Sequence, residues 1–283
     1  MSSCIERPTV VVRRLLAIAT LLLSGSALRA DILFLDSFRN VGFLQTGNGN
    51  TLSSNGAFFS SDLNTSIANS YASVSMSYPG PGSPVSLPQI TPNDYHYQTA
   101  SFATKSAMDA AFPTGTYLFQ ASGPSASASF QYTADDYGLS NPYLTGTDYT
   151  SLQGMNPAQA FTLHISPFTT GSNASVSFIF LTIFDYTKGM FVFSDGFLAP
   201  TTTTVALPAN TLAYGDNFSY EIDFSNRDLV ASPGATNQAQ LGFELRTDGN
   251  FSTAATPAPE PSTIALCGLA LLTVALRRRK PAR

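Results

Sequence analysis

Cysteine is almost absent from this sequence, which has two thiols in 283 residues. Cys4 lies near the beginning of the chain and Cys267 near its end, so the segment from Asp31 to Ala258 contains none. A disulfide, a thiolate nucleophile and a cysteine-ligated metal are therefore excluded from that segment. Its stability must come from packing alone.

Charged residues are also scarce, at 11% of the chain against roughly 25% in a typical soluble domain. In the central segment, basic residues are rarer than acidic residues. Between Asp31 and Ala258 five basic residues stand against sixteen acidic ones, which gives a formal charge of −11. A nucleic-acid-binding surface needs clustered basic residues, so no nucleic-acid partner is expected. The 21 Phe and 12 Tyr supply enough apolar surface for a packed core and exclude intrinsic disorder.

Histidine and the sequence motifs of catalysis are missing or nearly so. The two histidines, His96 and His164, lie in strand-like surroundings and are expected to be structural. No nucleophile elbow, His-rich zinc spacing or glycine-rich phosphate loop occurs. We therefore predict no catalytic residues, no metal site and no cofactor, and a protein that is not an enzyme. Glycoside hydrolysis by paired carboxylates stays open as the least favoured alternative, because sixteen acidic residues offer many pairs.

The beginning of the chain is typical of a secretory signal. Arg7, Arg13 and Arg14 precede an apolar run from Leu15 to Leu23, and the small residues 24–27 follow it. A basic lead, an apolar run and a small-residue exit are the features of an export signal in their required order. We predict a signal peptide over residues 1–30 with a signal helix, cleavage after Ala27 or Ala30, and export by the general secretory route.

The end of the chain has an ordered set of features. A linker over residues 252–258 leads to Pro259, Glu260 and Pro261, and an apolar stretch over 262–276 follows. About 15 helical residues span roughly 22 Å, which is short of the ~30 Å hydrocarbon core but within reach if the bilayer thins. The basic tail that follows would stay cytoplasmic, which leaves everything before Pro259 outside. That tail contains Arg277, Arg278, Arg279 and Lys280.

This arrangement resembles the PEP-CTERM protein-sorting domain of exported proteins of Gram-negative bacteria. The resemblance covers residues 257–280, and the predicted sorting tail comprises residues 259–283. It implies recognition by exosortase, a membrane-embedded transpeptidase-like enzyme, with transient anchoring in the inner membrane by the helix 262–276. Removal of the tail would then place the protein at the cell surface or in the extracellular matrix. The two prolines resist helix formation and should keep the motif extended and accessible. An ordinary tail anchor is the alternative.

The body between the two ends shows the alternation of β-strands. Phe218, Tyr220, Ile222 and Phe224 alternate with polar residues, as does the stretch from Leu241 to Leu245. Residues 176–186 are apolar on both faces and predict a central strand, with a hairpin at Gly189 leading into residues 190–193. The other predicted strands are 32–34, 57–60, 71–78, 95–102, 116–120, 126–132 and 161–165. The predicted helix is 105–112, which ends at Pro113.

These short strands predict an all-β body over residues 31–251, an antiparallel β-sandwich of the jelly-roll type. The tract 78–88 contains several prolines and glycines and is interpreted as a loop within one domain, with a domain linker as the alternative.

Two groups of body residues could bind ligands. The oxygen-rich clusters Asp135, Asp136 and Asn141, and Asp223, Asn226 and Asp228, could attract calcium, although neither has a regular ligand spacing and solvated turns are the favoured interpretation. The tyrosines between turn residues could stack on sugar rings or pack in the core. They are Tyr132, Tyr137, Tyr143 and Tyr149.

The sequence therefore favours an exported surface or matrix protein with a structural or adhesive role, associated with exopolysaccharide. A lectin-like carbohydrate-binding module is the alternative, and a secreted glycan-active enzyme is the third possibility. The predicted partners are exosortase, the inner membrane and exopolysaccharide.

Overall fold

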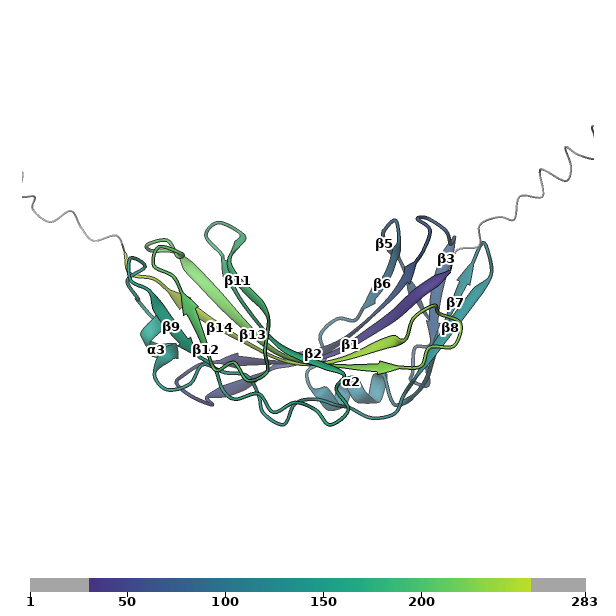
Figure 1. The fold of residues 1–283 in the computed structure, drawn as a ribbon, viewed down its shortest axis with the longest axis horizontal. Coiled ribbons are helices and arrows are strands. Elements are labelled where there is room, and N and C mark those ends of the chain that lie inside the picture. The colour runs from purple at the N-terminus through teal and green to yellow at the C-terminus, as the bar shows by residue number, and fades with distance from the viewer. Residues whose placement is uncertain (1–30, 256–283) are drawn as a thin grey trace, which may run out of the picture. The chain divides into compact units, whose positions relative to one another are not determined.

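The computed structural model describes residues 31–255 (Figure 1). The predicted signal peptide 1–30, the sorting motif Pro259-Glu260-Pro261, the membrane helix 262–276 and the basic tail from Arg277 to Lys280 lie outside the described residues. Within residues 31–255, no helix is long and apolar enough to cross a membrane.

Strands dominate the described part of the chain. Two short helices accompany them, α2 (Lys105–Ala111) and α3 (Asp148–Leu152). The strands are β1 (Ile32–Gln45), β2 (Leu52–Thr65), β3 (Ser73–Ser77), β4 (Val85–Leu87), β5 (Gln89–Thr91), β6 (Asp94–Gln98), β7 (Gly115–Ser122), β8 (Ala126–Tyr132), β9 (Phe161–His164), β10 (Val176–Asp185), β11 (Met190–Leu198), β12 (Thr204–Leu207), β13 (Asn217–Val230) and β14 (Ala239–Ser252).

The strands form three sheets. The largest has eight strands in the order β11-β10-β13-β14-β1-β2-β6-β5, another has four in the order β4-β3-β7-β8, and β12 pairs with β9. The pairs β7–β8, β10–β11 and β9–β12 are antiparallel, in agreement with the antiparallel architecture predicted from the sequence. The chain forms two compact units. Unit 1 comprises residues up to Arg39, Ala57–Asp135 and Arg227–Gly242, and unit 2 comprises Asn40–Gly56, Asp136–Asn226 and the residues from Phe243.

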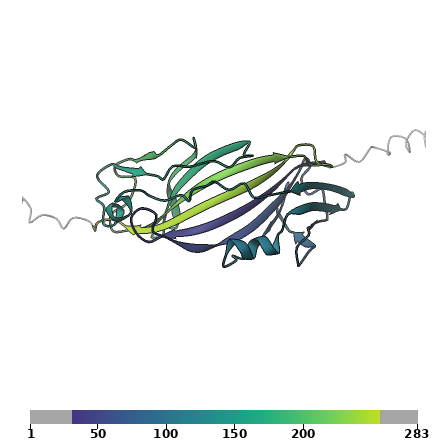
Figure 2. The same ribbon diagram turned by 90° about the horizontal axis from the view of Figure 1, so that it is seen from below.

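The core of unit 1 is built largely from aromatic rings. Tyr117 of β7 lies 5.2 Å from Phe130 of β8 and 6.0 Å from Phe59 of β2, measured between ring centroids. Phe112 follows α2 and stacks on Phe59 at 4.2 Å. Helix α2 begins where the Thr104 hydroxyl accepts a hydrogen bond from Ala107 N, and it lies against the strands of unit 1 (Figure 2). The two sheets and the helix therefore share one aromatic core.

The core of unit 2 lies on one face of its long strands. The apolar alternation in β13 buries Phe218, Tyr220, Ile222 and Phe224. Phe168, from the connection after β9, stacks on Phe224 at 4.5 Å. Strands β9 and β12 and helix α3 lie on one side of these strands (Figure 1). The opposite face of β10, β13 and β14 carries partly exposed side chains.

The structure confirms a mostly β chain with several sheets, and unit 1 has two sheets in contact as in a sandwich. The strand 126–132 has the predicted bounds, β10 is internal to its sheet, and the helix at Lys105 is present. Strands β4, β5 and β12 and helix α3 were not predicted. The jelly-roll topology stays a prediction. Residues 252–255 of the predicted linker contact the body, since Thr253 donates to Ala213 O at 2.6 Å.

Candidate functional site

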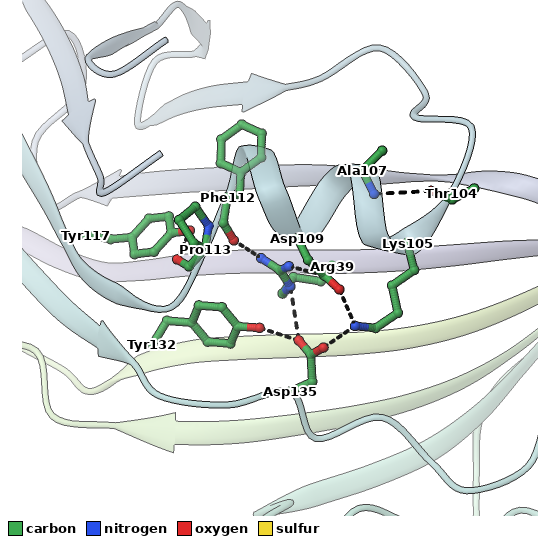
Figure 3. Close-up of polar contacts among 10 residues, drawn as sticks. All are labelled: Arg39, Thr104, Lys105, Ala107, Asp109, Phe112, Pro113, Tyr117, Tyr132 and Asp135. Carbon is green, nitrogen blue, oxygen red and sulfur yellow. Dashed lines mark hydrogen bonds and ion pairs between the residues drawn. The ribbon is translucent and has the colours of Figure 1, made fainter. Parts of the chain in front are cut away.

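A partly buried charged cluster, centred on the buried Arg39, lies between α2 and the strands of unit 1 (Figure 3). The Arg39 guanidinium of β1 donates to Phe112 O at 2.8 Å and to Asp109 Oδ1 at 2.6 Å, and its Nε lies 3.3 Å from Asp135. The Lys105 ammonium contacts both carboxylates, and the Tyr132 hydroxyl donates to Asp135. The Arg39 side chain is 4% exposed and lies over the Tyr132 ring at 4.7 Å.

This cluster is best explained as a structural lock. Two cations and two carboxylates balance each other, so the cluster presents no excess charge to a ligand. Burial alone would lower the pKa of Lys105, but the hydrogen bonds of its ammonium to Asp109 and Asp135 raise that pKa. The Arg39 fork fastens the end of α2 to β1 through the carbonyl of Phe112. The contacts of the cluster are with the protein itself, so we assign it a structural role. The candidate binding site lies in unit 2.

Unit 2 contains a pocket on the partly exposed face of β10, β13 and β14. Its volume is about 490 Å³, within the range of small-molecule sites. Side chains from six strands meet there because alternation directs every second residue of each strand to this face. The lining residues are Leu44, Asn55, Thr182, Phe184, Tyr186, Phe191, Ser219, Glu221, Arg246, Asp248 and Asn250.

One wall of the pocket is aromatic. The Phe184 ring meets Tyr186 at 5.3 Å and Phe191 at 5.2 Å, both edge-on. Tyr186 is 60% exposed and Phe191 is 61% exposed. Large aromatic side chains at such exposures leave much apolar area in contact with water, and contiguous exposed apolar area commonly marks an interaction site.

The opposite wall is polar and charged. The Arg246 guanidinium contacts Glu221 and lies 3.0 Å from Asp248 Oδ1. The Asn55 amide donates to Asp248 Oδ2 at 2.9 Å. These side chains hold each other in place, so hydroxyl-binding groups are fixed in the pocket before any ligand arrives.

Two neighbouring carboxyls of β13 differ in their environment. Asp223 is partly buried, and burial together with the nearby Glu221 and Glu244 charges raises its pKa well above the usual range. Burial also raises the pKa of Glu221, while the Arg246 guanidinium lowers it. Asp223 and Glu221 share a side-chain hydrogen bond. The Asp223 carboxyl therefore stays protonated to a higher pH than an ordinary carboxyl. Its protonated oxygen donates a hydrogen bond to Glu221.

An aromatic stripe extends from the pocket along β10. Phe178 and Phe180 lie on the same face of the strand as Phe184, because they precede it by six and four residues. The Phe197 ring of β11 packs on Phe178 at 4.9 Å and on Phe180 at 6.2 Å. Phe197 is 78% exposed and has a φ of 58°, at a register shift between β10 and β11. A bulky residue rarely adopts this conformation, and such outliers cluster at binding sites.

The two histidines are both held by aspartates. His96 Nδ1 lies 2.6 Å from Asp62 in unit 1, and His164 Nδ1 lies 3.0 Å from Asp148 in unit 2. Burial raises the pKa of Asp62, an effect that the contact with His96 opposes. Neither histidine lines the pocket.

In the first of the two acidic clusters considered as calcium ligands, other groups of the protein contact both aspartates. Asp135 joins the Arg39 cluster, whereas Asp136 accepts from the backbone amides of Ser172 and Asn173 at 2.8 and 3.0 Å. In the second cluster Asp223 and Asn226 belong to unit 2 and Asp228 to unit 1. No three His, Cys, Asp or Glu side chains within the described residues are arranged to hold a metal ion.

The tyrosines proposed for sugar stacking do not form an exposed platform. Tyr132 is 5% exposed, and Tyr137, Tyr143 and Tyr149 are half-buried. Within residues 31–255, the exposed aromatic residues are Tyr186, in the turn after β10, and Phe191 and Phe197 of β11. Their signal in the sequence was the apolar run 176–186, which contains alternate phenylalanines with Tyr186 at its end. The sequence analysis interpreted this run only as a central strand.

Comparisons with known proteins bear on the tail. Residues 257–280 match the PEP-CTERM protein-sorting motif. No curated protein matches the chain. Among solved structures, the chicken CNTN1 FN1-FN3 domains are similar at 9% identity with a TM-score of 0.23, over 70% of this chain and 64% of that one. The BSP domain of a biofilm associated protein is similar at 9% identity with a TM-score of 0.20, over 81% of this chain and 30% of that one. Similarity at these scores carries no inference about this chain.

The chain is thus a β-rich protein that ends in a sorting signal. That signal is the PEP-CTERM motif, so this is an exported protein that the motif directs to exosortase and to the cell surface. The resemblance of the C-terminal tail is confirmed.

Proposed function

We propose that this protein is an adhesive or structural component of the cell surface or extracellular matrix of a Gram-negative bacterium, and that unit 2 binds exopolysaccharide there. It travels by the general secretory route and is anchored in the inner membrane until exosortase removes its tail. The protein then associates with the polymer outside the cell.

The observation that carries the proposal is the pocket with one aromatic and one polar wall. A pyranose ring has an apolar face, which packs on flat aromatic rings such as Tyr186 and Phe191, and a rim of hydroxyl groups. The carboxylates of Glu221 and Asp248 and the amides of Asn55 and Asn250 are suited to bind those hydroxyls. The combination fits carbohydrate better than a wholly apolar ligand.

We propose that the site binds glycan without cleaving it. Glycosidases hold their two carboxyls roughly 5–9.5 Å apart, with the glycosidic bond between them. The two carboxyls that line this pocket, Glu221 and Asp248, both contact Nη2 of Arg246, so the guanidinium lies between them where a glycosidic bond would have to lie. Hydrolysis of a polysaccharide by the purified protein, abolished in Glu221→Gln, would contradict this part of the proposal.

Sedimentation with the host's exopolysaccharide tests the proposal. In a Tyr186→Ala/Phe191→Ala variant we expect about tenfold weaker binding, or about 1.4 kcal/mol, because the aromatic wall is lost. Leu139→Ala is the matched control, since Leu139 is 85% exposed in unit 2 and does not line the pocket. Equal binding by the wild type and the aromatic variant would overturn the proposal.

A lectin-like module that recognises single sugars or chain ends is the second candidate. The stripe from Phe178 to Phe184 favours a polymer, because it offers aromatic contacts beyond the pocket. Binding that tightens with oligosaccharide length supports the polymer, whereas equal binding of monosaccharides and long chains supports the lectin.

A further inference from the structure

We propose that the unit 2 pocket selects a polysaccharide that carries ammonium groups, such as one containing unacetylated amino sugars. This inference rests on the proposed function and specifies the chemical class of its ligand. Three observations support it. The lining of the pocket has a net negative charge, the lysine and arginine side chains of unit 2 within the described residues are all in ion pairs, and one wall of the pocket is aromatic.

The charge of the pocket is negative. Its lining contains two carboxylates, Glu221 and Asp248, and one guanidinium, Arg246. Glu244 lies two residues before Arg246 on β14 and accepts from the Asn40 amide at 3.2 Å. The side chains of Glu221 and Asp248 are 24% and 21% exposed, so their oxygens are within reach of a ligand. An ammonium group in the pocket would gain attraction from both carboxylates.

An acidic polysaccharide would find no free cation there. Within the described residues, unit 2 contains two basic side chains, Lys188 and Arg246. The Lys188 ammonium lies 2.9 Å from Asp185 and 2.8 Å from Asp216. Arg246 contacts Glu221 and Asp248, and its Nε and Nη2 both donate to Asp248 Oδ1. A uronate would have to displace one of these ion pairs, which would cost binding free energy. An ammonium sugar would not have to displace them.

The charge of the surrounding segment also favours a cationic ligand. The segment from Asp31 to Ala258 has a formal charge of −11, from sixteen acidic and five basic residues. A field of this sign concentrates cationic polymers at the surface and repels anionic ones. Attraction at long range is screened within about 10 Å at 0.1 M salt, so the selection should be strongest at low ionic strength.

The aromatic wall is compatible with a cationic sugar and adds to its binding. An ammonium group over the face of a Tyr or Phe ring is attracted by the ring quadrupole. Tyr186 and Phe191 are exposed on the wall opposite the carboxylates. An amino sugar can therefore place its ring or its ammonium on the aromatic wall while other groups face Glu221 and Asp248.

Calorimetric titration of the full-length chain in detergent tests the inference. The probes are three oligosaccharides of equal length, made of glucosamine, N-acetylglucosamine or galacturonate. At low ionic strength we expect the glucosamine oligomer to bind about tenfold more tightly than the N-acetylated one, and the galacturonate oligomer to bind most weakly. Added salt should reduce the preference for glucosamine.

Variants connect the preference to the pocket. Glu221→Gln/Asp248→Asn should weaken binding of the glucosamine oligomer more than binding of the N-acetylated oligomer, so that the preference for glucosamine disappears, and Asp248→Asn alone should reduce it. Asp195→Asn on β11 is the charge-matched control, since Asp195 does not line the pocket. Equal binding of the glucosamine and N-acetylglucosamine oligomers, or an unchanged preference in the double variant, overturns the inference and leaves the proposed function standing. If none of the three oligomers and no host exopolysaccharide binds, both fail.

Discussion

Asp223 shows how one partly buried carboxyl can oppose the stability of the fold. Its pKa in the folded protein is raised, mainly by burial, above the roughly 3.9 of an unfolded chain. Between these two pKa values the folded state holds more protons than the unfolded state. The free energy of unfolding therefore falls as pH rises from about 4 toward the folded pKa. This carboxyl stabilises the protein least at neutral and alkaline pH.

Asp223→Asn should consequently stabilise the protein at pH 8. The amide can still donate to Glu221 and never ionises. We expect the gain in unfolding free energy to exceed the roughly 0.5 kcal/mol scatter of surface substitutions, and to shrink at pH 4. Urea unfolding at both pH values measures it. A variant that is less stable than the wild type at pH 8 would refute the explanation.

Arg39 is the residue whose loss should destabilise unit 1 most. Arg39→Met removes the guanidinium and leaves Asp109 and Asp135 with Lys105 as their remaining cation. Both carboxylates are partly exposed, so we expect a loss in unfolding free energy of about 1.5–3 kcal/mol, the usual contribution of hydrogen bonds from a charged group. Lys105→Ala is the comparison: its side chain is 36% exposed, and we expect a loss of about 1 kcal/mol or less. Equal losses in the two variants would show that Arg39 is not the lock.

At the scale of elements, the β10–β11 hairpin depends on an aspartate at its turn. Asp185 Oδ1 accepts from the amides of Thr187 and Lys188 at 2.9 and 3.0 Å, and Gly189 completes the turn with a φ of 68°. Burial opposes the charge of Asp185, but the hydrogen bonds from Lys188 and Thr187 lower its pKa. The hairpin that presents Tyr186 and Phe191 is therefore held by an ionised side chain.

Asp185→Ala should destabilise this hairpin by about 2 kcal/mol, the usual contribution of hydrogen bonds to a charged group. Asp185→Asn keeps the acceptor without the charge and should cost less. Because the folded pKa is depressed, the stabilisation is present above the unfolded pKa of roughly 3.9 and is lost as pH falls below it. Thermal melts at pH 7 and pH 3 test this, and an equal difference between the wild type and Asp185→Asn at both pH values would contradict it.

Alternation predicted the elements that bury one face, and failed where burial comes from distant residues. Strand β8 has its predicted bounds because Ala128, Phe130 and Tyr132 mark the buried face without interruption. Strand β1 was predicted only as far as Phe34, yet it continues to Gln45. Its interior contains Arg39 and other polar residues, which are buried because partners far away in sequence bind them. A local pattern contains no information about such partners.

The short strands escaped prediction for another reason. Strands β4 and β5 have three residues each, and Pro84, Pro88 and Pro92 flank them. Three residues cannot display a period of two, and prolines are read as turns. These strands exist because longer neighbours supply hydrogen bonds, as β6 does for β5.

The candidate site could not be predicted from the sequence, for a related reason. Residues 176–186 are apolar on both faces, and composition alone does not tell which face another layer will cover. In the structure Ile179, Leu181 and Ile183 are buried, and the alternate phenylalanines are left on the partly exposed face. Glu221 and Arg246 were predicted on the polar faces of their strands, but their meeting in one pocket depends on the order of strands in the sheet.

At the scale of the whole molecule, the chain divides its tasks by segment. The tail matched to the PEP-CTERM motif directs export and sorting, and the body is free of cysteine and consists of two compact units. A structural lock of balanced charges lies in unit 1, and a pocket with a net negative lining lies in unit 2. We propose that unit 2 alone binds the polymer.

Hydrogen exchange of the exported protein, with and without the host's exopolysaccharide, measures this assignment directly. The account predicts slower exchange in peptides from β10 and β11 and from residues 244–250 of β14, with peptides of unit 1 unchanged. The Tyr186→Ala/Phe191→Ala variant should lose the protection. Protection confined to unit 1, or unchanged exchange throughout at a saturating concentration of polymer, would contradict the claim that unit 2 binds exopolysaccharide.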